Sequence, residues 1–275
     1  MSSGPRLDSG LQDHAEAAQV IHPSASIAAG AKLGAEVEVG PFAVIEEDTV
    51  VGDGCRIAAH AVIKRYTHLG RRNRVYEHAV IGGDPQDVKF DPACVSHTDI
   101  GDDNILREGV TVHRGSRAGS VTRIGNGCFL MALAHVAHDC TVGNHVVMVN
   151  NSGISGESAV GDHAFLGGAV GVHQHCRVGR NAMVGMNSKL VQDALPFCIT
   201  DGNPARARGL NLVGLRRAGF KAAEIAELKD AYRLLYQRVP LEEAVARMRK
   251  SPSNAVRELA TFIESCKRGF AHPQQ

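Results

Sequence analysis

An aliphatic residue at every sixth position is the feature that most restricts how this 275-residue chain can fold. The first run of such positions contains only Ile, Leu and Val: Ile21, Ile27, Leu33, Val39, Ile45, Val51, Ile57, Ile63, Leu69, Val75 and Ile81. A second run starts one residue out of register, and only Ala and Met residues depart from the pattern in it: Ile100, Leu106, Val112, Ala118, Ile124, Leu130, Val136, Val142, Met148, Ile154, Val160, Leu166, Val172, Val178, Val184 and Leu190. Neither the 3.6-residue period of a helix nor the two-residue period of a strand produces this spacing.

A six-residue unit holds one short strand and one turn, and repeated units of this kind stack into solenoids. Three units make a triangular coil of 18 residues, with the aliphatic side chain inside and neighbouring coils paired as parallel strands. The two runs contain 27 units, or about nine coils, which at ~4.8 Å per strand gives a prism roughly 40 Å long. Such a narrow core needs few aromatic residues, in agreement with 8 Phe, 4 Tyr and no Trp. The pattern therefore predicts a parallel β-helix over residues 20–201.

Two segments interrupt the repeat. Residues 82–99 cause the change of register, so we expect them to leave the prism as a loop. Residues 114–122 keep the register but place Ala118 where an aliphatic residue is expected. Loops on a rigid scaffold commonly carry functional sites.

The repeat is flanked by two different kinds of sequence. Residues 1–19 are polar and are predicted to form a flexible tail, and residues 202–209 (GNPARARG) resemble a linker. Helical spacing follows in three apolar stripes, which are Ile225, Leu228, Ala231, Tyr232 and Leu235; Leu241, Ala244, Val245 and Met248; and Val256, Leu259, Ile263 and Cys266. We therefore expect a linker and a small C-terminal helical domain over 202–275.

Composition excludes several classes of protein. A net charge of +1 argues against general binding to nucleic acid or to anionic membranes. No apolar run approaches the ~18 residues of a membrane span, so we expect no stable membrane insertion. The 7 Cys are scattered without a C-x-x-C motif, which favours reduced thiols and a cytoplasmic location.

The sharpest local feature is the segment AHVAHDC over residues 134–140. Because Val136 points inward, His135 is expected to point outward and His138 to lie near a corner of the prism. An imidazole beside a carboxylate, here Asp139, is suited to general-base catalysis. The equally weighted alternative is a solvent-exposed His in a turn.

Stacking places Asp139 one coil below Glu157, since 18 residues separate them. Two carboxylates at that spacing should raise the pKa of one of them, unless a cation lies between them. The alternative is a pair of splayed, hydrated side chains.

Other His residues are less informative by position alone. His113 and His173 each follow an inward residue and are expected to face outward. The run His173-Gln174-His175 has the character of a metal site, but such sites in β-helices need three His from two subunits. We therefore expect no bound metal.

Several segments together resemble one family, the bacterial UDP-N-acetylglucosamine O-acyltransferases of lipid A synthesis. They are PQDVKF (85–90), TVHRG (111–115), AHVAHDCTVGN (134–144), AVGVHQHCRVG (169–179) and GNPARARGLNLVGLRRAGF (202–220). The resemblance covers roughly residues 20–270. It implies a cytoplasmic homotrimer of left-handed β-helices with active sites between subunits. Such enzymes move a 3-hydroxyacyl chain from acyl carrier protein to the sugar 3-hydroxyl and use no cofactor.

The resemblance also implies roles for individual residues. His138 corresponds to the general base, Asp139 to its orienting partner, and the N–H of Gly156 to the oxyanion donor. The positions implied to contact the substrate are Asp87, Lys89, His113, His135, Glu157, His173, Gln174, Asn211 and Arg217. Arg216 and Arg217 also suit the acidic carrier protein.

Two residues depart from the family pattern. Many members have His where this chain has Glu157, so a sugar contact there is in doubt. Members that select long chains have Gly where this chain has Met186. A Met side chain would close the end of the acyl groove, which resembles members that use a donor of about ten carbons.

Three alternatives remain open. The related N-acyltransferase carries an N-terminal uridine-binding domain, for which the repeat beginning at Ile21 leaves no room, and its His is typically followed by Asn. Hexapeptide acetyltransferases that use acetyl-CoA usually lack the loop and helical tail. A non-catalytic scaffold or ice-binding helix would show repeated Thr or Ser columns, which are missing here.

Overall fold

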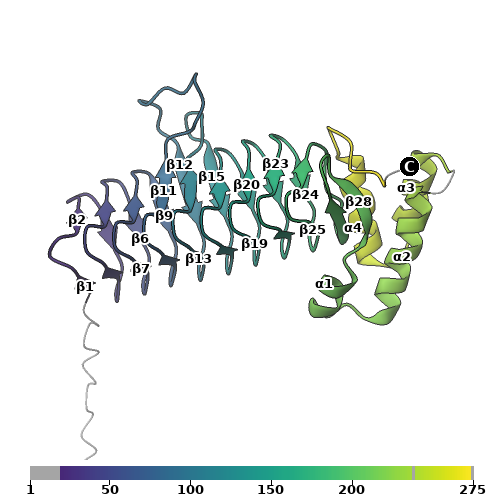
Figure 1. Ribbon diagram of the computed structural model, residues 1–275, viewed down its shortest axis with the longest axis horizontal. Coiled ribbons are helices and arrows are strands. Elements are labelled where there is room, and N and C mark those ends of the chain that lie inside the picture. Colours follow the sequence, from purple (N-terminus) through teal and green to yellow (C-terminus); the bar gives the residue numbers. More distant parts are fainter. Residues whose placement is uncertain (1–18, 237–238, 274–275) are drawn as a thin grey trace, which may run out of the picture.

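The computed structural model describes residues 19–236 and 239–273. These residues form an elongated prism with helices at its C-terminal end and one loop rising from its side (Figure 1). The flexible tail predicted for residues 1–19 falls, apart from Gln19, outside the described residues.

Three sheets make the sides of the prism, and the chain visits them in turn. The first sheet contains β1 (Val20–Ile21), β4 (Glu38–Val39), β7 (Arg56–Ile57), β10 (Arg74–Val75), β13 (Ile105–Leu106), β16 (Phe129–Leu130), β19 (Val147–Met148), β22 (Phe165–Leu166), β25 (Met183–Val184), β27 (Cys198–Asp201) and β28 (Arg206–Leu210). The second sheet contains β2 (Ser26–Ile27), β5 (Val44–Ile45), β8 (Val62–Ile63), β11 (Val80–Gly83), β14 (Thr111–His113), β17 (His135–Val136), β20 (Gly153–Ile154), β23 (Gly171–Val172) and β26 (Lys189–Leu190). The third sheet contains β3 (Lys32–Leu33), β6 (Val50–Val51), β9 (Thr67–Leu69), β12 (His97–Ile100), β15 (Val121–Ile124), β18 (Thr141–Val142), β21 (Ala159–Val160) and β24 (Arg177–Val178).

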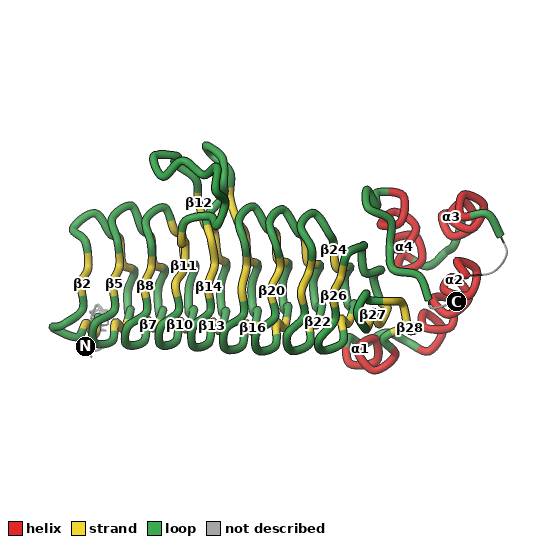
Figure 2. The backbone as a smooth tube through the Cα atoms, turned by 45° about the horizontal axis from the view of Figure 1, so that its top comes forward, coloured by secondary structure: helices red, strands yellow, loops and turns green. Residues whose placement is uncertain are grey.

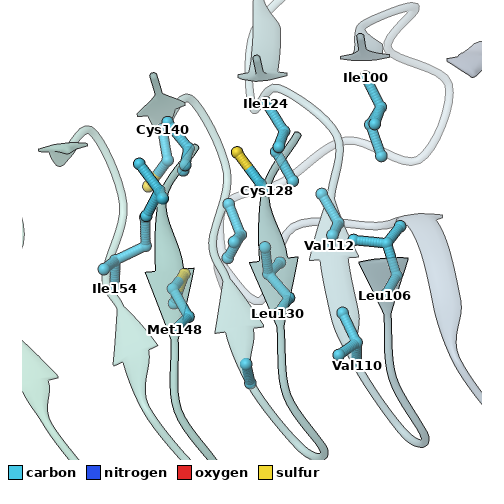
Figure 3. Packing of buried hydrophobic residues seen from close by; sticks show 14 of the residues in the cluster. Ile100, Leu106, Val110, Val112, Ile124, Cys128, Leu130, Cys140, Met148 and Ile154 are labelled. Carbon is cyan, nitrogen blue, oxygen red and sulfur yellow. The ribbon is translucent and has the colours of Figure 1, made fainter. Parts of the chain in front are cut away.

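Neighbouring strands in each sheet are parallel, except the antiparallel pair β27 and β28. The predicted fold class, an all-β left-handed parallel β-helix with a small helical C-terminus, is confirmed. From Val39 to Leu190 the repeated aliphatic side chains, Ala118 excepted, are at most 3% exposed. Figure 3 shows Leu106, Val112 and Leu130 pointing into this core. The six-residue period therefore built the interior as the sequence predicted.

A left-handed backbone residue turns the chain at most corners, three positions after the inward residue. Asp139 has φ 60° and Glu157 has φ 59°. Non-glycine residues adopt this conformation at some cost, and Asp, Asn and His tolerate it better than most. The turn fixes the backbone of each corner, so the corner side chains leave it in a set direction.

Both interruptions of the repeat are loops at the corner between the second and third sheets (Figure 2). The predicted loop of residues 82–99 rises from the prism there, although its first two residues still belong to β11 and its last three to β12. The expectation that Ala118 fills a core position is wrong, because β14 is followed directly by β15 and Ala118 is exposed. The interval from Val112 to Ile124 is one ordinary turn enlarged by a six-residue insertion, which preserves the period and hides the loop from a sequence count.

Arg114 holds the base of loop 82–99. Its side chain is buried and makes an ion pair with Asp84, with Nε 2.9 Å from Oδ1. The guanidinium also donates to the Cys94 carbonyl and to Ser96 Oγ, and it lies over the Phe90 ring at 5.0 Å. A planar fork of donors suits several acceptors at once, so one residue ties both ends of the loop to the prism.

The parallel sheet continues beyond the last repeated residue, Leu190, because β27 pairs with β25 of the first sheet. Residues 206–210 form β28 of a hairpin, so the interpretation of 202–209 as a linker is wrong for that part. The helices are α1 (Leu212–Arg217), α2 (Ala222–Tyr236), α3 (Leu241–Arg249) and α4 (Asn254–Glu264). The three apolar stripes predicted from the sequence form a second hydrophobic core. Leu241 is an exception because it is exposed, and Cys266 lies beyond the end of α4.

The second core also contains Leu195, Phe197 and Cys198 from the end of the prism. Arg180 adds an ion pair to Glu258 of α4, with Nη2 2.7 Å from Oε2. The helices therefore cap the prism. Among the described residues, no helix has both the length and the apolar character needed to cross a bilayer.

We predict that Arg114→Met loosens loop 82–99 while the prism stays folded. Backbone carbonyls now paired with the guanidinium would lose their donors, which costs about 1–3 kcal/mol of unfolding free energy. Hydrogen exchange measured by mass spectrometry should accelerate in residues 84–96 and remain unchanged elsewhere. Arg123→Met, an exposed position on β15, is the matched control, and equal protection of the loop in both variants would contradict the role of Arg114.

Candidate active site

The candidate residues gather along one edge of the prism, which we call the site edge. It consists of the corners at which the chain passes from the second sheet to the third, after β11, β14, β17, β20 and β23. Successive coils place on it the sequence-predicted residues His113, His138, Asp139, Gly156, Glu157, His173 and Gln174. Residues that lie 18 to 25 positions apart in sequence thus become neighbours, because each corner lies directly over the preceding one.

His138 and Asp139 form a hydrogen-bonded pair at the corner after β17. His138 Nδ1 lies 2.8 Å from Asp139 Oδ2, and the side chains are 21% and 7% exposed. An ionised carboxylate only accepts hydrogen bonds, so Nδ1 carries the proton and Nε2 keeps a free lone pair. The pair has the geometry of a general base with its orienting acid.

Asp139 is ionised because its neighbours outweigh its burial. Burial alone would raise the pKa of the carboxyl, but hydrogen bonds from Ser116, Ser120 and His138 lower the pKa to about 2. Ser116 donates twice, through Oγ at 2.6 Å and through its backbone N–H at 3.1 Å, both to Oδ2. The expectation that stacking raises a carboxyl pKa is therefore wrong for Asp139.

Glu157 has its own hydrogen-bonding and ion-pair partners. Its Oε1 lies 3.3 Å from Nη1 of Arg117, and its Oε2 lies 3.4 Å from Nδ1 of His175. Asp139 instead binds His138 and Ser116, so the two carboxylates are satisfied separately. The carboxylate of Glu157 therefore contacts Arg117 and His175 rather than the His138–Asp139 pair.

Gly156 lies against the imidazole of His138. A Cβ added at Gly156 would be 2.5 Å from Cε1 and 2.6 Å from Nε2 of that ring. The backbone N–H of Gly156 has no acceptor among the described residues. Only glycine lets the imidazole of His138 lie this close to the backbone whose N–H is free.

His113 and His135 form an edge-to-face pair beside this space, with ring centroids 4.8 Å apart. His135 is half-buried, and its Nδ1 contacts Thr111 Oγ1 at 2.8 Å. His113 lies on the site edge outside the aliphatic core, in agreement with the expectation that it faces outward, but it is covered there: Gly83 of β11 packs against its ring and leaves it 7% exposed. Burial, with the nearby His135 and His138, lowers the pKa of His113 to about 4 and also lowers the pKa of His135. Both rings are therefore neutral near pH 7.

His173 and Gln174 are exposed at the corner after β23, as predicted for His173. His173 Nδ1 lies 3.1 Å from the Gln174 carbonyl oxygen. The part of the chain that the structure describes contains no group of three or more His, Cys, Asp or Glu arranged to hold a metal ion.

Asp87 and Lys89 are not brought to the site edge within one chain. Both are exposed near the tip of loop 82–99, where Asp87 Oδ1 accepts the Lys89 N–H at 2.9 Å. Val88 between them is fully exposed. The loop extends outward from the prism (Figure 1), so its tip is free to contact another molecule.

Asn211 and Arg217 lie at a second place, a cavity of about 740 Å³ beside α1. It is lined in part by His145, His163 and Met183. The Asn211 side chain caps α1 by accepting the Gly214 N–H at 3.0 Å, and it donates to the Asn181 carbonyl at 3.0 Å. Asn211 therefore shapes this cavity, whereas the exposed Arg217 is the charged group available at it.

Met186 lies on another edge, at the corner between β25 of the first sheet and β26 of the second. Its side chain is 68% exposed. The second sheet separates this corner from the site edge. The outward positions of its strands β20 and β23 are Gly153 and Gly171, which leave that face open.

Sequence reasoning missed Ser116, Arg117 and Arg114 as parts of the site. All three belong to the insertion between Val112 and Ile124, and the preserved six-residue register concealed it. The sequence identifies residues 114–122 as an interruption, but the run RGSRAGS, with two Gly and two Ser in place of a strand, is the further signal that the segment leaves the coil as a loop.

Comparisons with known proteins agree over most of the chain. Residues 193–271 match the family model of UDP-N-acetylglucosamine O-acyltransferase domain 2, and residues 30–65 and 122–156 match the bacterial transferase hexapeptide model. An acyl-[acyl-carrier-protein]–UDP-N-acetylglucosamine O-acyltransferase of Paraburkholderia phymatum is 40% identical over 258 residues, which cover 91% of this chain and 98% of that protein.

Solved structures give the same result. The UDP-N-acetylglucosamine acyltransferase of Campylobacter jejuni is 35% identical, with a TM-score of 0.87 over 92% of this chain and 100% of that chain. The enzyme of the same description from Francisella novicida is 31% identical, with a TM-score of 0.89 over 92% and 94%. The chain therefore belongs to the family of acyl-[acyl-carrier-protein]–UDP-N-acetylglucosamine O-acyltransferases.

Proposed function

We propose that this protein transfers a 3-hydroxyacyl group from acyl carrier protein to the 3-hydroxyl of UDP-N-acetylglucosamine, the first step of lipid A synthesis. The named relatives supply the donor and acceptor classes. The observation that carries the mechanism is the hydrogen-bonded His138–Asp139 pair, whose imidazole lies against Gly156.

In this mechanism His138 Nε2 removes the proton from the sugar hydroxyl as its oxygen attacks the thioester carbonyl. Asp139 stabilises the imidazolium that forms, and the Gly156 N–H donates to the carbonyl oxygen as it gains negative charge. Collapse of the tetrahedral intermediate breaks the C–S bond, and the proton on His138 passes to the departing thiolate. Because the thioester is already activated, a base, an oxyanion donor and accurate positioning suffice without a cofactor.

Substrate contacts follow from the arrangement of the site edge. We assign the sugar to His113, His135, Glu157, His173 and Gln174, and the nucleotide to the cavity of Asn211 and Arg217. The neutral rings of His113 and His135 are suited to hydrogen bonds with hydroxyls. Glu157, already paired with Arg117 and His175, contributes its remaining acceptor capacity rather than a free charge.

A homotrimer completes this site. Asp87 and Lys89 project away from their own prism, and Met186 lies on a different edge from His138, so a site that uses all of them takes groups from two subunits.

Arg216 and Arg217 lie exposed on α1, where an acidic carrier protein would find positive charge. All 7 Cys are free thiols, which agrees with a cytoplasmic location.

The experiment that tests the function incubates the protein with UDP-N-acetylglucosamine and a series of 3-hydroxyacyl carrier proteins, with products identified by mass. We expect O-acylated nucleotide sugar from the wild type, and a loss of about 10²–10⁴-fold in kcat for His138→Ala, since a general base is removed. His60→Ala, an exposed ring stacked between Phe42 and His78 on another edge, should retain activity. Substantial turnover by a folded His138→Ala trimer would reject His138 as the base.

Asp139→Asn should lower kcat by on the order of 100-fold or more, because an amide no longer stabilises the imidazolium or selects the Nδ1–H tautomer. Steady-state kinetics with saturating donor would measure this loss. Asp99→Asn breaks a comparable but exposed pair, in which Asp99 Oδ1 lies 2.8 Å from His68 Nδ1. That variant should keep wild-type kcat, and a similar loss in both would show that the effect is structural.

Met186→Gly should lengthen the accepted chain beyond the roughly ten carbons expected of the wild type. Removing an exposed side chain at the proposed end of the groove leaves space for further methylenes, each contributing about 0.8 kcal/mol when buried. The same donor series gives the length profile, and Met186→Leu, which keeps the volume, should preserve it. An unchanged profile for Met186→Gly would remove Met186 from the groove.

A further inference from the structure

Ser116 occupies an unusual place in the fold. It lies in residues 114–120, which we call the inserted loop, and this loop bends along the site edge toward the next coil. Gly115 passes so close to Ser120 that an added Cβ would lie 2.2 Å from its Oγ, and the Arg117 N–H donates to that Oγ at 3.0 Å. The Gly115 N–H also donates to the His97 carbonyl at 3.2 Å. The inserted loop therefore has a defined shape at Ser116.

Ser116 directs both of its donors at the Asp139 carboxylate. The hydroxyl lies 2.6 Å from Oδ2, and the backbone N–H lies 3.1 Å from Oδ2 and 3.3 Å from Oδ1. Oδ2 is the same oxygen that accepts the His138 Nδ1–H at 2.8 Å. Ser116 and His138 thus bind one carboxylate oxygen from two sides.

Apart from a hydrogen bond from Ser120 of the same inserted loop, the remaining contacts of Asp139 hold its backbone. Its N–H donates to Thr122 Oγ1 at 2.7 Å, and its φ of 60° fixes the corner. The side chain still rotates about Cα–Cβ unless something outside the corner holds it. Among the described residues, the side-chain hydrogen bonds that the Asp139 carboxylate receives from a different coil come from the inserted loop, and Ser116 supplies the shortest of them.

We propose that Ser116 is a positioning residue for the acyl transfer proposed above, on which this inference rests. Its hydroxyl and N–H hold the Asp139 carboxylate so that Oδ2 faces His138 Nδ1, which keeps the imidazole oriented with Nε2 toward Gly156. Ser116 acts through Asp139 and His138 and does not itself touch the substrate. The inserted loop is thereby part of the catalytic machinery rather than a surface irregularity.

The Ser116 hydroxyl also weakens the electrostatic effect of the Asp139 carboxylate on the imidazole of His138. A donor on Oδ2 draws off part of the negative charge that would otherwise favour a proton on the imidazole. Removing the hydroxyl should leave the His138 ring less firmly oriented. It should also favour the protonated form of that ring. The other titratable or charged groups around the pair are His113 of β14, His135 of β17, Arg117 of the inserted loop, and Glu157 and His175 of the following corners.

The test compares Ser116→Ala and Ser116→Thr in the trimeric protein with acyl carrier protein donor and UDP-N-acetylglucosamine. We expect Ser116→Ala to lower kcat about tenfold or more with little change in KM, and to move the acid limb of the pH profile of kcat to higher pH. Ser116→Thr keeps a hydroxyl and should restore both quantities. Ser152→Ala removes a buried hydroxyl of the neighbouring coil that has no partner among the described residues, and it should behave as wild type.

A second measurement needs no substrate. Diethyl pyrocarbonate modifies unprotonated imidazole, so the rate of modification at His138, followed by peptide mass spectrometry across pH, reports the state of the ring directly. In Ser116→Ala the midpoint of this profile should move to higher pH, as the kinetic limb does. If the wild type failed to transfer acyl groups, the proposed function would fall, while this profile would still test the contact of Ser116 with the pair.

Two results would overturn the role of Ser116. One is a Ser116→Ala variant with wild-type kcat and an unmoved modification profile. The other is a Ser116→Thr variant as impaired as Ser116→Ala, which would mean that a hydroxyl at this position does not restore the function. A parallel loss in Ser152→Ala would likewise assign the effect to folding.

Discussion

Parallel pairing between coils is the interaction on which the rest of the molecule depends. Each strand of two to five residues is too short to be stable alone, and it persists because the same hydrogen bonds recur in every coil above and below it. The aliphatic column inside the prism makes this stacking favourable, since burial of apolar surface contributes about 25 cal/mol per Å². Once the coils are in register, every corner residue has a fixed neighbour one coil away, and the surface becomes as ordered as the interior.

That order is what assembles the candidate active site. His138, Gly156 and Gln174 occupy equivalent positions of three successive coils, and their separation is set by the strand spacing rather than by flexible loops. Groups needed for acyl transfer must be held within a fraction of an ångström to be effective. A prism of paired coils supplies such precision without a large domain. Its edges, where the backbone turns and side chains leave the core, are the natural place for chemistry.

Each ionisable group of the site edge has its own partner or is kept neutral by burial. Asp139, ionised by donors that outweigh its burial, is reserved for His138. Glu157 is held by Arg117 and His175, and the rings of His113 and His135 stay neutral because they are buried. The basic nitrogen of His138 is therefore the group left free to accept a proton next to the Gly156 N–H. Both Ser116 and Arg117 come from the inserted loop, so a six-residue insertion governs the electrostatics of the whole edge.

The sequence by itself determined the prism, because an aliphatic residue at every sixth position can be buried continuously when the chain winds into stacked triangular coils. Counting from Val136 then placed His138 and Asp139 at a corner of the prism. The family resemblance supplied the roles expected of these residues. Only the tertiary structure decided that Ala118 lies outside the core, that residues 206–210 form a strand, and that His113 is buried under Gly83. It also decided that Asp139 is bound by Ser116 rather than coupled to Glu157. The physical reason is that a repeat reports which way side chains point within a coil, whereas an insertion of one full period leaves that signal intact while its residues fold back onto another coil. Contacts between coils depend on where the loops go, and no local spacing encodes that path.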